Sequence, residues 1–111
     1  MTEPINLLSR RIHTELGSVL DQMAPDAAEP LIEAICKASR LGLHGLGREG
    51  LQMKGLAMRL YHLGLDAHVA GEMTTPPLSA GDLLIVSAGP GEFESIAALM
   101  GRVRAAGART A

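Results

Sequence analysis

The chain has 111 residues, of which 47% are hydrophobic and 2% aromatic, and its formal net charge at pH 7 is -2. A chain of this length forms one domain with a modest core. The acidic balance and the absence of a basic run exclude most nucleic-acid binders, because phosphate contacts need clustered Lys and Arg. Tyr61 and Phe93 are the only aromatic residues, so a single-stranded nucleic acid would find almost no stacking surface.

The cysteine content and the hydropathy predict where the protein resides. A single cysteine, Cys36, excludes an intramolecular disulfide and fits a reducing compartment. The chain opens without an apolar segment of signal-peptide length, and no run of about 18 apolar residues is free of charge. We therefore expect a cytoplasmic protein with no membrane partner.

Two helices are predicted before the first strand. Between residues 5 and 23, apolar residues recur at the spacing of one helical stripe, which needs the next helix or another subunit to bury it. Asp26 and Glu29 have the spacing of a capping box, so a second helix is predicted from Asp26 to about Ser39. Its predicted buried face consists of Leu31, Ile32, Ile35 and Cys36.

A strand, a glycine-rich turn and a helix follow in direct succession. Residues 41–44 predict a strand, residues 45–50 (GLGREG) a turn, and residues 50–63 a helix that Gly64 terminates. The predicted inward face of this helix consists of Leu51, Leu56, Ala57, Leu60 and Leu63. Glycines let the backbone approach a ligand closely, and free N–H groups at the helix start point at it. An anion is the expected ligand.

The second half of the chain repeats this alternation. Residues 65–70 predict a short strand, and residues 71–77 a loop, because two consecutive prolines exclude a helix interior or a central strand. Residues 82–87 are almost continuously apolar, as in a parallel strand covered on both faces. A second glycine turn at 88–91 then leads into a helix over residues 92–106, ended by Gly107. Its predicted inward face consists of Ile96, Leu99, Met100 and Val103.

Strands that alternate with helices predict an α/β fold with a parallel sheet and right-handed connections. Three strands are expected, preceded by two helices, and a fourth strand is missing or barely begun after residue 107. Three strands leave an open sheet edge that another element must cover. The sequence therefore predicts a homo-oligomer, or a fragment of a longer protein.

Four motifs occur in an order that is known from one family. They are GLGREG (45–50), AMRLYHLGLDAHVAGEMTTPPL (57–78), GDLLIVSAG (81–89) and GEFESI (91–96). On these motifs the chain resembles the sugar isomerase (SIS) domain, and in particular its 6-phospho-3-hexuloisomerase branch. The resemblance implies N-terminal helices over 1–39 and a partial SIS domain over 40–111, together one structural unit. It also implies a flavodoxin-like, three-layer parallel sheet, a dimer or tetramer, and phosphorylated sugars bound at the carboxyl ends of the strands.

Several residues depart from the family pattern. Glu49 stands where family members usually carry a serine, and Ala88, Pro90 and Phe93 replace hydroxyl-bearing residues of a second turn that reads roughly S-G-S-G-E-T. Each hydrogen bond to a charged group is worth about 1.5–3 kcal/mol. Losing three hydroxyls and, at Pro90, one N–H, while gaining a nearby carboxylate, predicts a phosphate site weakened by several kcal/mol.

Candidate ligand-binding residues lie in the two glycine turns and in the loop between them. They are Gly45, Gly47, Arg48, Glu49, Thr74, Thr75, Ala88, Gly89, Gly91 and Glu92. Arg48 either clamps an anion or is solvated or paired with Glu49. The two threonines either reach a sugar or only build the turn before Pro76. Glu92 is explained equally well by a favourable interaction with its own helix dipole.

Glu72 and His44 are the candidate catalytic residues. The resemblance implies aldose–ketose isomerisation through an enediol, which needs an acid/base group and neither a metal nor an organic cofactor. In the alternative interpretation, Glu72 is a loop carboxylate that binds backbone or water, and His44 is a packed or capping histidine. His13, His62 and His68 share no ligand spacing with Cys36, so no metal site is predicted.

A second interpretation is a non-catalytic, oligomeric module that binds a carbohydrate derivative or regulates another process. In that case Glu49, Pro90 and Phe93 shape the inherited cleft for a neutral or differently charged ligand, or close it. Stabilisation of the fold by a sugar phosphate would separate the two interpretations.

Overall fold

The structure is a computed structural model that describes residues 2–89, 91 and 93–111. The chain divides into two compact units, of which the first ends at Pro30 and the second runs from Leu31 to Ala111. The first unit consists mainly of helix α1 (Ile5–Asp21), which confirms the first predicted helix. None of the residues in α1 is buried, and Ile12, Leu16 and Leu20 are each more than half exposed. Its apolar stripe is therefore available to a partner.

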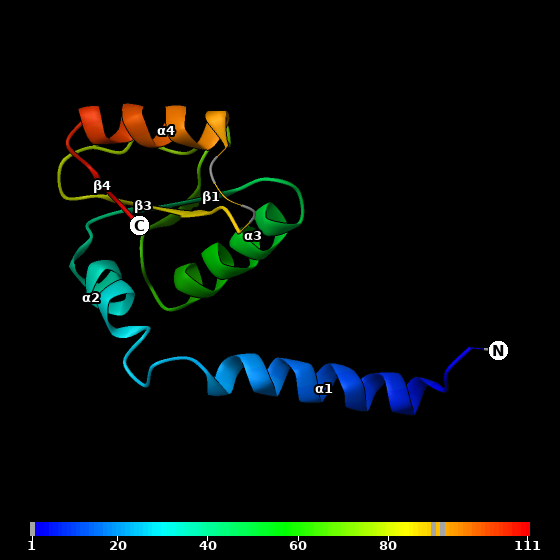
Figure 1. The fold of residues 1–111 in the computed structure, drawn as a ribbon. Coiled ribbons are helices and arrows are strands. Elements are labelled where there is room, and N and C mark those ends of the chain that lie inside the picture. Colours follow the sequence, from blue (N-terminus) through cyan, green and yellow to red (C-terminus); the bar gives the residue numbers. More distant parts are fainter. Residues whose placement is uncertain (1, 90, 92) are drawn as a thin grey trace. The chain divides into compact units, whose positions relative to one another are not determined.

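The second unit contains a parallel sheet of four strands in the order β2-β1-β3-β4. Figure 1 shows this sheet between helices α3 and α4. The strands are β1 (Leu41–Gly45), β2 (Ala67–Val69), β3 (Leu83–Ser87) and β4 (Arg109–Thr110). The predicted α/β class is confirmed, and the two-residue β4 is the fourth strand that the sequence left as missing or barely begun. Gly107, at φ 93°, turns the chain after the last helix, and β4 then pairs with β3 over two residues. The edge strands of the sheet are therefore β2 and β4, and β3 is hydrogen-bonded to a strand on each side.

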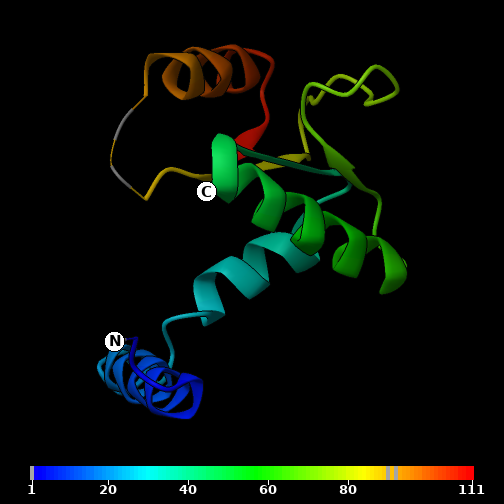
Figure 2. The ribbon, with the colours of Figure 1, turned by 90° about the vertical axis from the view of Figure 1, so that its right-hand side faces the viewer.

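Helices cover both faces of this sheet. Helix α3 (Gly47–His62) packs on one face and α4 (Glu94–Ala105) lies on the other (Figures 1 and 2). The main core cluster joins α3 to the central strands and consists of Leu41, Leu43, Met53, Ala57, Leu60, Leu83 and Ile85. The helix α2 (Glu29–Lys37) packs against this cluster through Ala34 and Ile35. The result is a three-layer arrangement in which the carboxyl ends of the strands lie at one edge.

The predicted boundaries and buried face of the second helix need correction. Residues 25–28 form turns and α2 begins at Glu29, so Asp26 does not cap it. Leu31, Ile32 and Cys36 are exposed, whereas Ile35 packs on the core as predicted. The contact stripe runs through the small residues Ala34 and Ala38, which allow a close approach that hydropathy alone does not indicate.

The predicted inward face of α3 is also partly wrong. Ala57 and Leu60 are buried as expected, but Leu51 is 67% exposed and Leu63 is 77% exposed, and Leu56 is exposed as well. Met53 takes the remaining core position, four residues before Ala57. The sheet therefore buries Met53 together with Ala57 and Leu60, and leaves the three leucines exposed. Gly64, at φ 90°, ends the helix region as predicted.

The last helix agrees with its prediction. Helix α4 begins at Glu94, two residues later than expected, and Ile96 is buried. Leu99, Met100 and Val103 are partly buried on the same side of the helix. Among the helices in the described part of the chain, none combines the length and apolar character needed to cross a membrane.

Three ionisable side chains meet near the start of β1 and β2. Asp66 accepts hydrogen bonds from Arg40 Nε at 2.9 Å and shares one with His68 Nε2 at 2.6 Å. These contacts, first with His68 and then with Arg40, lower the pKa of the Asp66 carboxyl from its usual value. A carboxyl whose pKa is lowered by folding stabilises the fold above its unfolded pKa, and this contribution is lost as the pH falls through the folded pKa.

The Asp66 contacts predict an acid-dependent stability. The melting temperature of wild type is expected to exceed that of Asp66→Asn near pH 5, and the difference should shrink as the pH is lowered toward about 2. Salt should reduce the difference because the group is exposed. Thermal unfolding followed by circular dichroism measures both effects. A difference that is independent of pH would show that Asp66 acts through its shape rather than its charge.

Candidate functional site

The junction between β1 and α3 is much tighter than a loop. Leu46 alone separates the two elements, so most of the sequence GLGREG forms the first turn of α3 rather than the predicted turn before it. A Cβ on Gly50 would lie 2.6 Å from the carbonyl oxygen of Gly45, which means that the backbones are in direct contact there. Gly47 has φ 55°, a conformation that favours glycine. Among the described residues, no side chain caps this end of α3, so its first N–H groups have no side-chain partner there.

A cavity of about 260 Å³ opens beside this junction, at the carboxyl ends of β1 and β2. We call it the strand-end cavity. Its titratable lining residues are His44 from β1, Lys54 from α3 and Glu72 from the loop after β2. The two predicted catalytic residues therefore line one cavity, together with a cation. A carboxylate, an imidazole and an ammonium group around one space are suited to proton transfer on an anionic substrate.

The strand register explains why these side chains meet. Leu43 pairs with Val69, and the N–H of Ala70 donates to the carbonyl of Leu43 at 2.8 Å, so β1 and β2 end side by side. The hydroxyl of Thr75 donates to the carbonyl of Val69 at 2.6 Å and ties the following loop to the end of β2. Glu72 is carried in that loop. Glu72 therefore lies at the cavity because its loop starts at the end of β2 and is tied back to that end by Thr75.

Lys54 was not among the predicted site residues. It lies four residues after Gly50, one turn further along the same face of α3. That spacing is the signal by which the sequence could have identified it, since the glycine marks the side of the helix that meets the strand ends. The predicted inward face of the helix consisted only of apolar residues, and no role was predicted for Lys54.

A second contact crosses from α3 to the end of β3. Gly45 pairs with Ser87, so the chain leaves β1 and β3 at neighbouring points. The N–H of Gly89 donates to Oε1 of Glu49 at 2.7 Å. In an open parallel sheet, ligands bind where neighbouring strands have connections that run in opposite directions, and here that point lies between β1 and β3. The carboxylate of Glu49 therefore occupies part of the region in which an anion was predicted.

The remaining predicted ligand-binding residues are dispersed. Arg48 is exposed, and within residues 2–89, 91 and 93–111 it forms no ion pair, so the suggested pairing with Glu49 is absent there. Ala88 is half-buried, and Gly91 is exposed at φ 119°. Pro90 and Glu92 lie outside the described residues, so the roles predicted for them stay predictions.

The two threonines of the loop differ in their surroundings. Thr75 uses its hydroxyl hydrogen in the bond to Val69, which supports the turn interpretation, although its oxygen retains a lone pair for a ligand. Thr74 is exposed and lines neither the strand-end cavity nor the larger groove described next. Ligand binding by either residue stays a prediction.

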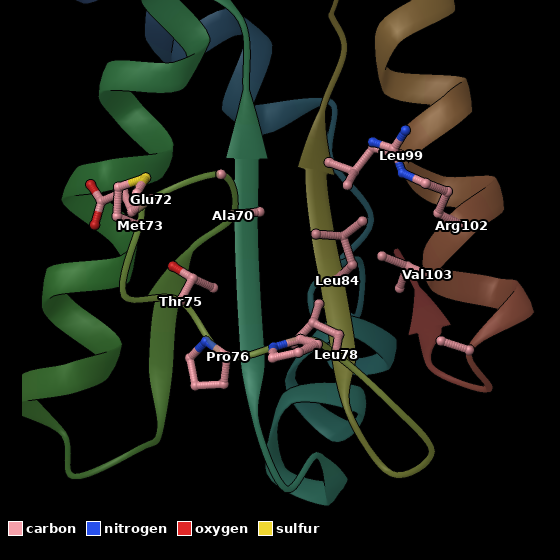
Figure 3. Close-up of a pocket in the computed structure, with 13 residues that line it drawn as sticks. Ala70, Glu72, Met73, Thr75, Pro76, Leu78, Leu84, Leu99, Arg102 and Val103 are labelled. Carbon is pink, nitrogen blue, oxygen red and sulfur yellow. The ribbon is translucent and has the colours of Figure 1, made fainter.

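A larger and mostly apolar groove of about 540 Å³ lies on the α4 side of the sheet (Figure 3). The loop after β2 forms one wall, with Pro76 and Leu78, and α4 forms the other, with Leu99 and Val103. Its charged lining residues are Glu72 and Arg102. Glu72 thus borders both spaces, but the apolar walls of the groove offer few partners for a sugar. In the part of the chain that the structure describes, no three His, Cys, Asp or Glu side chains are grouped to hold a metal ion.

The chain is similar in sequence to proteins named 3-hexulose-6-phosphate isomerase. It is 40% identical to the one from Bacillus subtilis (strain 168) over 85 residues, which are 77% of this chain and 46% of the relative. It is 38% identical to the one from Mycobacterium gastri over 100 residues, which are 90% of this chain and 50% of the relative. The chain therefore spans about half the length of the curated relatives it matches. No family model matches the chain.

Two solved structures are similar to the fold. A crystal structure of a hypothetical protein superposes with a TM-score of 0.86 at 27% identity, covering 96% of this chain and 58% of that one. A hypothetical protein from Methanococcus jannaschii superposes with a TM-score of 0.69 at 34% identity, covering 74% of this chain and 48% of that one. For the second protein, the crystal structure was taken to infer a 3-hexulose-6-phosphate isomerase function.

Proposed function

We propose that this chain, as a member of the sugar isomerase (SIS) family, binds a sugar phosphate in the strand-end cavity. The proposed reaction interconverts a ketose and an aldose, or two ketoses whose carbonyl groups lie on adjacent carbons. The observation that carries the proposal is the meeting of His44, Lys54 and Glu72 around one cavity at the strand ends. A hexulose 6-phosphate is the first substrate to test, because the named relatives act on one.

The proposed reaction moves one proton between adjacent carbons of the sugar. Glu72 removes the proton from the carbon next to the carbonyl, which gives an enediol, and the protonated carboxyl returns it to the neighbouring carbon. His44 transfers the hydroxyl proton between the two oxygens, as an imidazole near neutral pH is able to do. Lys54 holds the phosphate by a charge-assisted hydrogen bond. Atoms and electrons balance without a further reactant.

One observation favours a non-catalytic alternative, in which the chain is a carbohydrate-binding or regulatory module. The Glu49 carboxylate at Gly89 N–H places a negative charge where a phosphate would otherwise bind. In either case we propose a homo-oligomer, because the exposed apolar stripe of α1 and the edge strands β2 and β4 offer surfaces to another copy.

Thermal unfolding with millimolar hexulose, pentulose and heptulose phosphates tests the proposal, with the oligomeric mass measured alongside. A ligand at ten times its dissociation constant should add about 1.4 kcal/mol of stability. Lys54→Met is expected to remove this stabilisation. The matched control is Lys37→Met, since Lys37 is an exposed helical lysine paired with Glu33.

Three outcomes of this experiment can be told apart. A shift with one sugar phosphate that Lys54→Met abolishes and Lys37→Met retains supports the strand-end cavity as the site. A well-folded protein that none of the sugar phosphates stabilises would contradict the proposal. A shift that survives Lys54→Met would place the phosphate at another position.

A further inference from the structure

Helix α1 carries an apolar face that the first unit leaves exposed. The helix has 17 residues, none of which is buried, and spans about 26 Å. Ile12, Leu16 and Leu20 on this face are each more than half exposed. A folded chain in water rarely leaves a continuous apolar stripe of this length uncovered, so the stripe marks an interaction surface.

The order of apolar residues on this face is symmetric about Thr14. Three pairs of apolar residues are equally distant from Thr14, by two, six and nine positions. The pairs are Ile12 with Leu16, Leu8 with Leu20, and Ile5 with Met23, which lies two residues beyond the helix. Two copies of α1 that lie antiparallel, with Thr14 at the midpoint, therefore bring apolar side chains onto apolar side chains along the whole stripe.

Val19 is an exception to this symmetry, because its mirror position is occupied by Ser9. The Ser9 hydroxyl donates to the carbonyl of Ile5 at 2.8 Å. Since the hydroxyl has this partner within its own helix, it can be covered by a second copy without losing its hydrogen bond.

The charges beside the stripe favour the same arrangement. Arg11 and Glu15 are four residues apart and lie on one flank of the stripe, while Asn6 and His13 lie on the other. In an antiparallel pair, the two-fold axis sets each flank beside the same flank of the second copy. Arg11 then lies about 3 Å along the helix axis from Glu15 of the second copy, and symmetry repeats the contact. A parallel pair would set these charges against Asn6 and His13 instead.

The present contact of Arg11 is compatible with this pairing. Its Nη2 donates to Oε1 of Glu3 at 2.9 Å, and the arginine side chain is 60% exposed. An exposed ion pair is weak, so Arg11 can exchange Glu3 for the second copy. Each Glu15 also has Arg11 one turn away in its own helix, which offsets its approach to Glu15 of the second copy.

We propose that two copies of this chain associate through α1, which packs antiparallel against α1 of the second copy with Thr14 at the midpoint. The inference goes beyond the proposed function, because it concerns the first unit and requires no sugar phosphate. A second copy is the partner that fits, since both the apolar stripe and the charges on its flank are complementary to themselves.

Disulfide cross-linking tests the arrangement on the full chain, with the exposed Cys36 replaced by Cys36→Ser. Mild oxidation of Leu8→Cys/Leu20→Cys is expected to give a covalent dimer on a non-reducing gel. The two cysteines of one chain are about 18 Å apart along the helix, so they cannot bond to each other. For the same reason, neither single variant should cross-link. Arg10→Cys/Ser18→Cys is the matched control, because its positions are equally distant from Thr14 but lie on the opposite face.

A covalent dimer that only Leu8→Cys/Leu20→Cys forms would support the inference. Cross-linking of Leu8→Cys by itself would show a parallel pair and overturn it, as would equal cross-linking of the control on the opposite face. No covalent dimer from any variant, in protein with the helical circular dichroism of wild type, would also overturn it.

The charge pairing is tested in the same Leu8→Cys/Leu20→Cys chain. Arg11→Glu is expected to slow cross-linking about tenfold, and Arg11→Glu/Glu15→Arg to restore the rate. Glu3→Gln is the control, because it breaks only the contact of Arg11 within the chain and should leave the rate unchanged. A rate that Arg11→Glu does not alter would overturn the proposed register.

Discussion

Glu72→Gln is expected to lower the rate of sugar-phosphate isomerisation about a hundred- to ten-thousandfold, the usual contribution of a positioned general base. Glu72 lines the strand-end cavity with His44 and Lys54, and the amide of glutamine fills the same space without accepting a proton. Because the loop position and the cation are unchanged, the variant should still bind the sugar phosphate. Steady-state rates measured with thermal shifts on the same samples test both parts.

Glu33→Gln serves as the control for a lost surface carboxylate and should keep the wild-type rate, because Glu33 pairs only with Lys37 on α2 among the described residues. A Glu72→Gln variant that isomerises as fast as wild type would remove Glu72 from the mechanism. A variant that loses binding as well as rate would make Glu72 a ligand contact rather than the base.

Gly50→Ala is expected to lower the free energy of unfolding by about 1–3 kcal/mol, because the added Cβ overpacks the β1–α3 junction. That Cβ would lie 2.6 Å from the carbonyl oxygen of Gly45, which is backbone and cannot rotate away. Strand and helix would have to separate, and the strand-end cavity would change with them. Urea unfolding measures the effect.

Gly55→Ala is the matched control in the same helix. A Cβ on Gly55 would meet no atom of the described residues within 4 Å apart from its own helix backbone and chain neighbours, so the substitution should stabilise the protein by up to about 1 kcal/mol through helix propensity. Opposite signs for the two substitutions are the expected result. Stabilisation by both would mean that β1 and α3 are not in direct backbone contact.

Much of the fold could be predicted from local pattern. The apolar run of β3, the proline loop after β2 and the glycines that end α3 and α4 each act through neighbouring residues, and their predictions are confirmed. The sequence left strand β4 open, as missing or barely begun, because two residues carry no periodicity of their own. It forms because β3 offers unpaired backbone groups to a chain that Gly107 turns back.

The site could be predicted only in part, because some of its contacts depend on how distant segments pair rather than on local pattern. The sequence identified His44 and Glu72 as strand-end residues, and the structure places both at one cavity. It did not identify Lys54, because the sheet, and not the helix alone, decides which face of α3 is buried. Nor could it pair Glu49 with Gly89, since that contact depends on the register of β1 against β3.

Hydrogen exchange in the substrate tests the central claim most directly. A hexulose 6-phosphate is incubated with the purified protein in deuterated water and followed by NMR. Proton transfer at the strand-end cavity predicts protein-dependent isomerisation with deuterium entering at the carbon next to the carbonyl, and predicts that Glu72→Gln abolishes both. Neither conversion nor deuterium incorporation above the protein-free control, from folded wild-type protein, would contradict the account.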